Sequence, residues 1–547
     1  FASYYGDHMV LQKEPAGAVV WGYGEPGAVV TVVLSGAGGL IVTKKTAQVK
    51  GPSGTWTTVL DPMDRGGPYT LTAGQGLENV TLQDIYFGDV WLCSGQSNMA
   101  MTVLQIANAS SELAATARYP YVRVFAAAPA RSNIELEDLE RIDLLWSIPT
   151  AENLGHGNFT YFSAVCWLLG RYLYEALQYP IGLVEAAWGG TPIEAWSSRR
   201  ALQACGFPED TGRTGLVFCT PLSPALSSSI SPHWHLSGPQ TPSVLWNAMI
   251  HPLLNMTLRG VAWYQGEANA FLHTDRYNCT FPALIADWRR AFHAGSAGQT
   301  ELLLPFGFVQ LSTYRRQSPD DSFARLRWHQ TADVGVVPNA RMPGTFMAVA
   351  MDLCDEHSPY GRRVLGGGDE GVETKLSDTN PTSLLFLGSI HPRDKQNVAH
   401  RLQLGARAVA YGEKDLVFQG PYPTRAILEV TRGLLNVTYS QELVCRRRDT
   451  QAFEVRKGKS FPPQGWKREA HLDGGFSPTQ VCCSSHPSPC GWLPAPVVAV
   501  ESRTVTLALA GCRTLVLALR YAWAEWPCEY ESCALYNTQG LPAPPFL

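Results

Sequence analysis

The pattern of apolar and polar positions divides the chain into three parts. In the first, short β-rich runs such as residues 28–34 alternate with Gly and Pro, which is typical of a small antiparallel sandwich. In the second, apolar runs such as Val90–Cys93 precede helical stretches such as residues 164–177, as expected where strands feed helices. In the third, the alternating β pattern resumes. We therefore expect an N-terminal β domain (1–87), a central α/β domain (88–412) and a C-terminal β-rich domain (413–547).

Further elements and three insertions are expected within these domains. Apolar runs predict buried strands in the central domain at residues 181–185, 260–264, 306–311 and 345–351, and a closing helix at residues 400–411. Three stretches lack periodicity and are rich in Gly, Ser, Pro or charge, namely residues 208–239, 362–387 and 456–480. Such composition is typical of flexible insertions.

The composition excludes several classes of partner. Of the 547 residues, 43 are Lys or Arg and 47 are Asp or Glu, which gives a formal net charge of -4. Because this charge provides no basic field, we expect no binding to nucleic acid or to an anionic membrane surface. The sequence has no run of about 18 apolar residues, the length that crosses a bilayer, so no membrane span is expected. The expected partner is small or neutral.

Glycosylation signals and cysteines indicate the compartment. The chain opens with Phe1 rather than Met, so the compartment has to be inferred from internal residues. The thirteen cysteines include a C-terminal cluster, Cys482, Cys483 and Cys490, and the pair Cys528 and Cys533, which favour disulfides in an oxidising compartment. We therefore expect a protein of the secretory pathway, lysosomal or secreted. Asn-x-Ser/Thr triplets predict N-glycans at Asn79, Asn108, Asn158, Asn255, Asn278 and Asn436.

The most informative segment for chemistry is Ser94-Gly-Gln-Ser-Asn-Met99, which follows a predicted buried strand. Open α/β sheets bind ligands at the carboxyl ends of their strands, so a serine here can face a cleft. The segment is not a Gly-x-Ser-x-Gly nucleophile elbow, because Met99 occupies the position of the second glycine. Taken alone, such a hexapeptide is more often a polar turn that begins a helix.

Four blocks place the segment in a wider context. The chain resembles the sialate O-acetylesterases, which belong to the SGNH hydrolase superfamily, over nearly all of its length. The blocks occur in the family's order: Phe-Gly-Asp-Val-Trp-Leu-Cys-Ser-Gly-Gln-Ser-Asn-Met at residues 87–99, Ala-Trp-Gly-Gly-Thr-Pro-Ile-Glu-Ala-Trp at 187–196, Val-Ala-Trp-Tyr-Gln-Gly-Glu-Ala-Asn at 261–269, and Ser-Ile-His-Pro-Arg-Asp-Lys at 389–395.

The resemblance implies a fold and an activity. The fold would be an SGNH-hydrolase (flavodoxin-like) three-layer α/β domain flanked by β-sandwich-like domains. The activity would be that of a serine esterase that hydrolyses O-acetyl esters of sialic acids, the 9-O-acetyl ester in preference, through an acyl-enzyme. No cofactor or metal is implied. The partners would be O-acetylated sialic acids, free or on glycoconjugates.

Ester cleavage needs a nucleophile and donors for the oxyanion, and the blocks supply both. The family resemblance implies that Ser97 is the nucleophile, and its own backbone N–H is a natural first donor. Gly189 or Gly190 leaves room for a further backbone N–H to approach the substrate. The side-chain amide of Gln265 resembles the family's additional donor. Taken separately, the glycine pair is compatible with an ordinary tight turn and Gln265 with a surface amide.

The general base has to be chosen among thirteen histidines. Two of them, His251 and His391, lie in the same local string, Ile-His-Pro, which spacing cannot separate. The resemblance assigns the base to His391, just before the last helix of the hydrolase domain. A single histidine is more often structural than catalytic, and we expect this of His251.

The group that orients His391 is left open by the sequence. Many SGNH hydrolases hold the histidine with an aspartate three residues earlier, but Gly388 occupies that position here. In the family, the stretch after Asp352-Leu-Cys-Asp355 leads quickly into the Ile-His-Pro motif, whereas residues 362–387 intervene in this chain. The candidates are Asp352, Asp355, Asp394 or a backbone carbonyl.

Three other functions are alternatives. One is a glycan-binding protein with an inactive hydrolase fold, but retention of Ser97, Gln265 and His391 argues against this. An SGNH esterase that acts on another acetylated sugar is a second alternative. A metalloenzyme using Asp352, Asp355, His357 and His391 is disfavoured, since no His-Glu-x-x-His or paired Cys-x-x-Cys spacing supports it.

Overall fold

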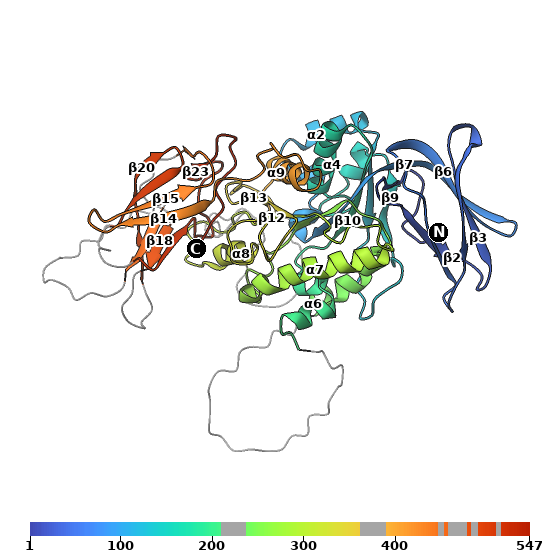
Figure 1. Ribbon diagram of the computed structural model, residues 1–547, viewed down its shortest axis with the longest axis horizontal. Coiled ribbons are helices and arrows are strands. Elements are labelled where there is room, and N and C mark those ends of the chain that lie inside the picture. Colours follow the sequence, from blue (N-terminus) through green and yellow to red (C-terminus); the bar gives the residue numbers. More distant parts are fainter. Residues whose placement is uncertain (209–236, 361–389, 447–452, 458–478, 483–490, 510–515) are drawn as a thin grey trace, which may run out of the picture.

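The computed structural model describes residues 1–208, 237–360, 390–446, 453–457, 479–482, 491–509 and 516–547. In Figure 1, a central sheet covered by helices lies between two β-rich parts, which form the ends of an elongated molecule. The smaller sheets at the ends are antiparallel. The expected mixed α/β centre with flanking antiparallel sheets is therefore confirmed.

The central sheet runs in the order β13, β12, β11, β7, β10, β8 and β9. All neighbouring strands on this path are parallel except β8 and β9. Helices cover both faces, so the parallel strands are almost continuously apolar and buried. The strands are β7 (Glu78–Gly95), β8 (Val122–Ala127), β9 (Ile142–Ser147), β10 (Ile181–Ala187), β11 (Gly260–Tyr264), β12 (Phe306–Gln310) and β13 (Thr345–Val349).

Strand β7 belongs to two parts of the molecule. Its first half pairs with β6 of the N-terminal β domain, and its second half pairs with β10 and β11 of the central sheet. Gly88 lies at the change of partners, where a Cβ atom would stand 1.9 Å from the carbonyl oxygen of Pro180. The expected boundary at residue 87 thus falls inside one continuous strand, which couples the β domain to the strand that leads to Ser97.

Helices α4 (Ala164–Leu177) and α9 (Lys395–Val409) pack together on one face of the sheet, and α7 (Tyr277–Gly295) lies on the other (Figure 1). The start of α9 is fixed by Asp394, whose side chain accepts a hydrogen bond from the backbone N–H of Asn397 at 3.0 Å. The shorter helices are α1 (Ser97–Ala100), α2 (Ala109–Ala115), α3 (Ala151–Leu154), α5 (Ile193–Trp196), α6 (Arg199–Ala204) and α8 (Ser322–His329).

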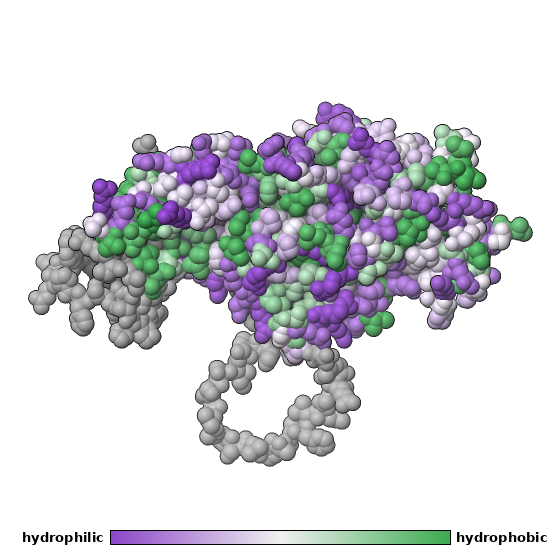
Figure 2. Space-filling model, in the orientation of Figure 1, coloured by the Kyte–Doolittle hydropathy of each residue, from purple (hydrophilic) through white to green (hydrophobic). Residues whose placement is uncertain are grey.

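The N-terminal β domain has two layers around buried tryptophans. Strands β2 and β5 pair with each other, while β3 pairs with both β4 and β6. Trp21 and Trp56 are almost fully buried. Figure 2 shows apolar patches on the outer end of this domain. Its exposed apolar side chains include Leu40, Ile41 and Leu77. The strands are β1 (Val10–Gln12), β2 (Val19–Tyr23), β3 (Val29–Ser35), β4 (Ile41–Gln48), β5 (Thr55–Val59) and β6 (Gly66–Gln75).

The C-terminal part consists of small antiparallel sheets. One sheet has the order β14, β15, β21 and β20, strands β17, β19, β18 and β22 close on themselves, and β16 pairs with β23. The strands are β14 (Pro423–Glu429), β15 (Leu434–Tyr439), β16 (Val444–Cys445), β17 (Phe453–Lys457), β18 (Thr479–Cys482), β19 (Gly491–Pro494), β20 (Val497–Glu501), β21 (Thr504–Ala508), β22 (Ala518–Tyr521) and β23 (Leu535–Tyr536).

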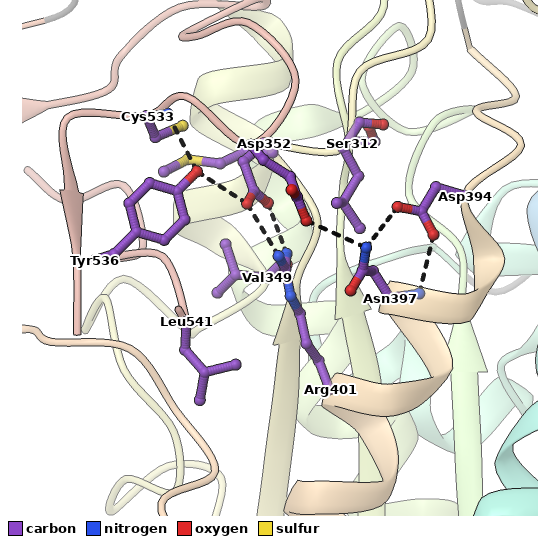
Figure 3. A network of polar contacts seen from close by, with 12 residues as sticks. Ser312, Val349, Asp352, Asp394, Asn397, Arg401, Cys533, Tyr536 and Leu541 are labelled. Carbon is purple, nitrogen blue, oxygen red and sulfur yellow. Dashed lines mark hydrogen bonds and ion pairs between the residues drawn. The ribbon is translucent and has the colours of Figure 1, made fainter. Parts of the chain in front are cut away.

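A buried polar network joins the C-terminal part to the central domain (Figure 3). The carboxylate of Asp352 accepts two hydrogen bonds from the guanidinium of Arg401, at 2.6 and 3.0 Å. The hydroxyl of Tyr536, on β23, donates to the same carboxylate at 3.1 Å. Both charged side chains are almost fully buried. The pair therefore lies in a region of low dielectric, where each charge depends on the other.

Removing one member of this network should destabilise the protein strongly. Replacement of Asp352 by alanine leaves the Arg401 cation buried and unpaired, so we expect the free energy of unfolding to fall by about 3–5 kcal/mol. Urea unfolding measures the loss. The matched control is Glu301→Ala, which removes the exposed partner of Arg259 and should cost about 1 kcal/mol or less. Equal losses in the two variants would contradict the prediction.

Disulfides link distant parts of the chain. Cys93 on β7 is bonded to Cys166 on α4, and Cys205 is bonded to Cys279 on α7. The prediction of C-terminal disulfides is confirmed by the bond between Cys528 and Cys533. Cys483 and Cys490 lie outside the described residues. Structural disulfides are typical of proteins of the secretory pathway.

The three expected insertions fall mostly outside the described residues. The whole of 362–387, residues 209–236 of the first insertion and residues 458–478 of the third lie there. Among the helices of the described ranges, none is long and apolar enough to cross a bilayer.

Candidate active site

Ser97 lies at the turn between β7 and α1, at the carboxyl edge of the central sheet. β7 ends at Gly95, whose φ of +147° and close approach to the carbonyl of Tyr264 leave no room for a side chain. The backbone N–H of Gln96 donates to the same carbonyl at 3.0 Å. The chain therefore turns sharply after the strand, and Ser97 remains partly exposed. This is the edge at which open α/β sheets place their ligands.

The structure brings His391 to Ser97. The Nε2 atom of His391 lies 2.7 Å from the Ser97 Oγ atom. The Nδ1 atom lies within hydrogen-bond distance of the backbone carbonyl oxygen of Tyr360. Because a carbonyl only accepts, Nδ1 carries the hydrogen of the neutral ring, which leaves the lone pair of Nε2 facing the hydroxyl. This is the tautomer that a general base requires.

Two further contacts hold the His391 loop. The hydroxyl of Ser358 donates to the His391 carbonyl at 2.6 Å. The ring of Phe159 packs against the imidazole, with 5.3 Å between the ring centroids. Phe159 itself adopts the left-handed backbone region, with φ of +55°, and its N–H donates to the side chain of Gln105 at 2.8 Å. A bulky residue in this region is strained, and such strain is often found beside active sites.

The three aspartates expected as possible partners of His391 bond elsewhere. Asp352 accepts from Arg401 and Tyr536 (Figure 3). Asp394 accepts from Asn397 and Tyr530, which makes it the cap of α9.

The third candidate, Asp355, accepts three hydrogen bonds from Arg393, at 2.6 to 3.0 Å. Although burial acts in the other direction, these bonds hold the pKa of Asp355 below its usual value. In the described ranges, no group of three or more His, Cys, Asp or Glu side chains is placed to hold a metal ion.

The two glycines expected to provide oxyanion donors differ in their surroundings. Gly189 lies next to Ser97, since a Cβ atom on it would stand 3.4 Å from the Ser97 Cβ. Gly190 has φ of +73° and faces open space. Both glycines follow β10, the neighbour of β7 in the sheet. Backbone N–H groups of this loop are therefore within reach of a group bound at Ser97.

Gln265 is fully buried and its amide is hydrogen-bonded within the protein. Its Nε2 atom donates to the Asn269 side chain at 2.8 Å and to the Thr191 carbonyl at 3.1 Å. Its Oε1 atom accepts from the hydroxyl of Tyr277 at 2.9 Å. The amide thus holds the loop that carries Gly189 and Gly190. Donation from Gln265 to an oxyanion stays a prediction.

The comparisons with known proteins give the family. A sialate O-acetylesterase from Rattus norvegicus is 54% identical over 100% of this chain and 93% of its own length. The chain belongs to the sialate O-acetylesterase family. The Homo sapiens member is 53% identical over 100% of this chain and 92% of its own length. The family model for the sialate O-acetylesterase C-terminal domain matches residues 464–547.

A solved structure agrees with this assignment. The crystal structure of a carbohydrate acetylesterase from Xanthomonas citri is 25% identical, with a TM-score of 0.70, and the match covers 99% of this chain and 98% of that chain. The family membership predicted from the four blocks is thus confirmed, and with it the class of carboxylic ester hydrolase.

The other Ile-His-Pro string of this family member lies in a different environment. His251 follows the π-helix of residues Trp246–Ile250. Its Nδ1 atom lies 2.8 Å from the carbonyl oxygen of Leu136, and its Nε2 atom lies 3.5 Å from the carboxylate of Glu135. Both partners belong to the loop before β9. These contacts support the structural role expected for His251.

The predicted glycosylation sites differ in exposure. Asn79, Asn108 and Asn158 are exposed. The other three asparagines are partly buried, namely Asn255, Asn278 and Asn436, and the amides of the last two donate to Asp333 and Glu429. A glycan requires a free amide nitrogen at the surface, so the structure favours the first three positions.

Sequence reasoning did not single out three polar side chains that meet beside the dyad. Asn98, Glu267 and Lys395 lie in the same sequence blocks as Ser97, Gln265 and His391, and all three are buried. Burial lowers the pKa of Lys395 to about 7, against the opposing field of Glu267. Burial also raises the pKa of Glu267, against hydrogen bonds that include one from Asn98. The only sign of these residues in the sequence is their place in the four blocks. The contacts among them depend on the folded structure.

A buried carboxyl behind the site should make stability depend on pH. Glu185 on β10 accepts a hydrogen bond from the backbone N–H of Ser163 at 2.5 Å, and burial raises its pKa to about 8 despite this bond. The folded protein therefore keeps a proton that the unfolded chain loses above pH ~4.5. The stabilisation is complete below that pH and is lost as the pH rises through about 8.

Replacement of Glu185 by glutamine should remove this dependence. We expect the melting temperature of Glu185→Gln, relative to that of the unmodified protein, to be higher at pH 8 than at pH 5, since glutamine cannot ionise. Thermal melts between these pH values measure the difference. The exposed Glu152 provides the control, because Glu152→Gln should leave the difference constant. A difference for Glu185→Gln that does not change with pH would contradict the prediction.

Proposed function

We propose that this chain hydrolyses O-acetyl esters of sialic acids, the 9-O-acetyl ester in preference, with Ser97 as nucleophile and His391 as general base. The observation that carries the proposal is the 2.7 Å contact between the His391 Nε2 atom and the Ser97 Oγ atom. The sialate O-acetylesterases to which the chain is similar supply the substrate class.

The geometry supports a two-step reaction through an acetyl-enzyme. In the first step, His391 accepts the proton of the Ser97 hydroxyl while Oγ attacks the acetyl carbonyl carbon. The tetrahedral intermediate then collapses, and the sugar oxygen leaves with the proton held by His391. In the second step, a water molecule gives a proton to His391 and attacks the acetyl group. Acetate leaves, and the proton returns to Ser97.

The oxyanion of each intermediate is stabilised by backbone donors. We propose the N–H groups of Ser97 and of the loop at Gly189 and Gly190, because this loop lies against the nucleophile. One such donor typically contributes about 3–4 kcal/mol to transition-state stabilisation. Gln265 holds the loop through Thr191. The carbonyl of Tyr360 orients His391 in this proposal.

The finer features of fold and location belong to the same proposal. In this proposal, the central, mostly parallel sheet with helices on both faces is the three-layer arrangement of an SGNH hydrolase (flavodoxin-like), here between β-sandwich-like domains. The disulfides and the exposed Asn79, Asn108 and Asn158 support a lysosomal or secreted glycoprotein. Its substrates are O-acetylated sialic acids, free or on glycoconjugates.

The test is acetate release from defined esters by the purified protein. We expect turnover of 9-O-acetylated sialic acid to exceed turnover of an O-acetylated neutral sugar, such as acetylated xylose. The carbohydrate acetylesterase from Xanthomonas citri makes the second substrate a necessary comparison. Preference for the neutral sugar would replace the substrate assignment. Absence of both acetate release and labelling by a fluorophosphonate would instead indicate a hydrolase fold without catalysis.

A further inference from the structure

The side chain of Asn98, next to the proposed nucleophile, contacts three different parts of the chain. Its Nδ2 atom donates to the carboxylate of Glu267 and to the backbone carbonyl of Ile390, the latter at 2.8 Å. Its Oδ1 atom accepts from the ammonium of Lys395 at 2.7 Å. Ile390 immediately precedes His391. One amide therefore joins the turn of Ser97 to both ends of the segment that carries His391.

The orientation of this amide is fixed by its partners. A carbonyl only accepts, so Nδ2 must face Ile390, and Oδ1 then faces Lys395, which donates to it. The carboxylate of Glu267 selects the same orientation, since it accepts the other Nδ2 hydrogen. The amide thus bridges the Glu267 carboxyl and the Lys395 amine, and hydrogen bonds in such a buried network strengthen one another.

The three side chains are held in place by burial. Asn98 is 1% exposed, Glu267 is 3% exposed and Lys395 is fully buried. The ammonium of Lys395 also lies 5.1 Å from the centre of the Tyr264 ring, a distance at which a cation is attracted by the ring face. A hydrogen bond lost at such a buried site leaves its partner group unsatisfied, which is costly.

We propose that Asn98, Glu267 and Lys395 form a positioning cluster that holds the His391 segment against the nucleophile turn and so sets the distance from Nε2 to Oγ. The proposal rests on the proposed function of Ser97 and His391. The cluster does not touch the reacting atoms. Its effect is geometric, because displacement of a catalytic group by about 1 Å can cost roughly 10²-fold in rate.

The first test is Asn98→Ala, which removes the bond to Ile390. We expect kcat to fall by about 10²-fold while KM changes less than threefold, because the cluster aligns the base and does not bind substrate. The rate of Ser97 labelling by a fluorophosphonate should fall by a similar factor. The matched control is Asn537→Ala, since Asn537 is equally buried and makes several side-chain hydrogen bonds in the C-terminal part. It should lower the melting temperature and leave kcat of the folded protein within twofold.

A pair of variants at Glu267 separates positioning from packing. Glu267→Gln keeps an oxygen that can accept from Asn98, whereas Glu267→Ala keeps none. We expect the alanine variant to lose at least tenfold more kcat than the glutamine variant. Lys395→Met, which retains the apolar stem but removes the donor, serves if Asn98→Ala does not fold, and its kcat should also fall by at least tenfold.

The outcomes distinguish the two proposals. Unchanged labelling rates and kcat in folded Asn98→Ala or Lys395→Met, or equal losses in the two Glu267 variants, would overturn the positioning role. If the unmodified protein is labelled at Ser97 but releases no acetate from sialic acid esters, the proposed substrate is wrong. The labelling rates of the variants then still test the cluster.

Discussion

Replacement of Ser97 by alanine is expected to lower acetyl release by about 10⁴ to 10⁶-fold while the protein remains folded. Losses of this size are typical when the nucleophile of a serine hydrolase is removed. The Ser97 hydroxyl is partly exposed and its described hydrogen bond goes to His391, so its loss leaves no cavity in the core. Initial rates with 9-O-acetylated sialic acid, together with thermal melts, measure both parts of the prediction.

The neighbouring serine provides a matched control. Ser94 lies three positions earlier on β7, is fully buried, and its hydroxyl has no hydrogen-bond partner among the described residues. Ser94→Ala should therefore retain the activity of the unmodified protein. Labelling by a fluorophosphonate should disappear in Ser97→Ala and persist in Ser94→Ala. Activity of Ser97→Ala within tenfold of the unmodified protein would mean that another residue is the nucleophile.

The parts of the fold that local pattern determines were predicted well. The helix expected at residues 164–177 is α4, with the same bounds, because Ser163 caps its first turn and its residues are almost all apolar or helix-forming. The strand expected at residues 260–264 is β11, also with the same bounds. In both elements the local sequence and the tertiary environment favour the same structure.

The start of α9 was predicted wrongly. The helix expected at residues 400–411 begins at Lys395, five residues earlier, and ends at Val409. The polar run that starts with Lys395 does not show an apolar face, and the burial of this lysine depends on partners far away in the sequence, Asn98 among them.

Helix α7 was not predicted at all. It spans Tyr277–Gly295 and contains Pro282, which reads as a break in a helix when the sequence is considered alone.

The candidate site, like the fold, has parts that the sequence predicts and parts that it does not. The blocks bring Ser97 and His391 to attention, and the fold places them in contact. The partner of the His391 Nδ1 atom is a main-chain carbonyl, which has no signature in the sequence because every residue has one. The packing of Phe159 on the imidazole is a contact across the fold, which local spacing does not encode. Motifs therefore indicate which residues react, whereas the positioning groups depend on tertiary structure.

The two Ile-His-Pro strings provide the sharpest test of the site. Replacement of His391 by alanine should lower kcat by about 10⁴ to 10⁶-fold, because the proton of Ser97 then has no acceptor at 2.7 Å. Replacement of His251 by alanine should act on stability instead. It leaves the carbonyl of Leu136 without its partner, which costs about 1–3 kcal/mol, while turnover of the folded protein stays within about twofold.

Added imidazole distinguishes the two variants further. The space left by His391 opens beside Ser97, so free imidazole should restore part of the lost turnover in His391→Ala, with an increase that saturates. The same addition should have no effect on His251→Ala, since the ring of His251 contacts the loop before β9 rather than the nucleophile. Loss of turnover in a stable His251→Ala protein, with His391→Ala fully active, would reverse the assignment of the base, because removal of the general base should lower the rate of acyl transfer.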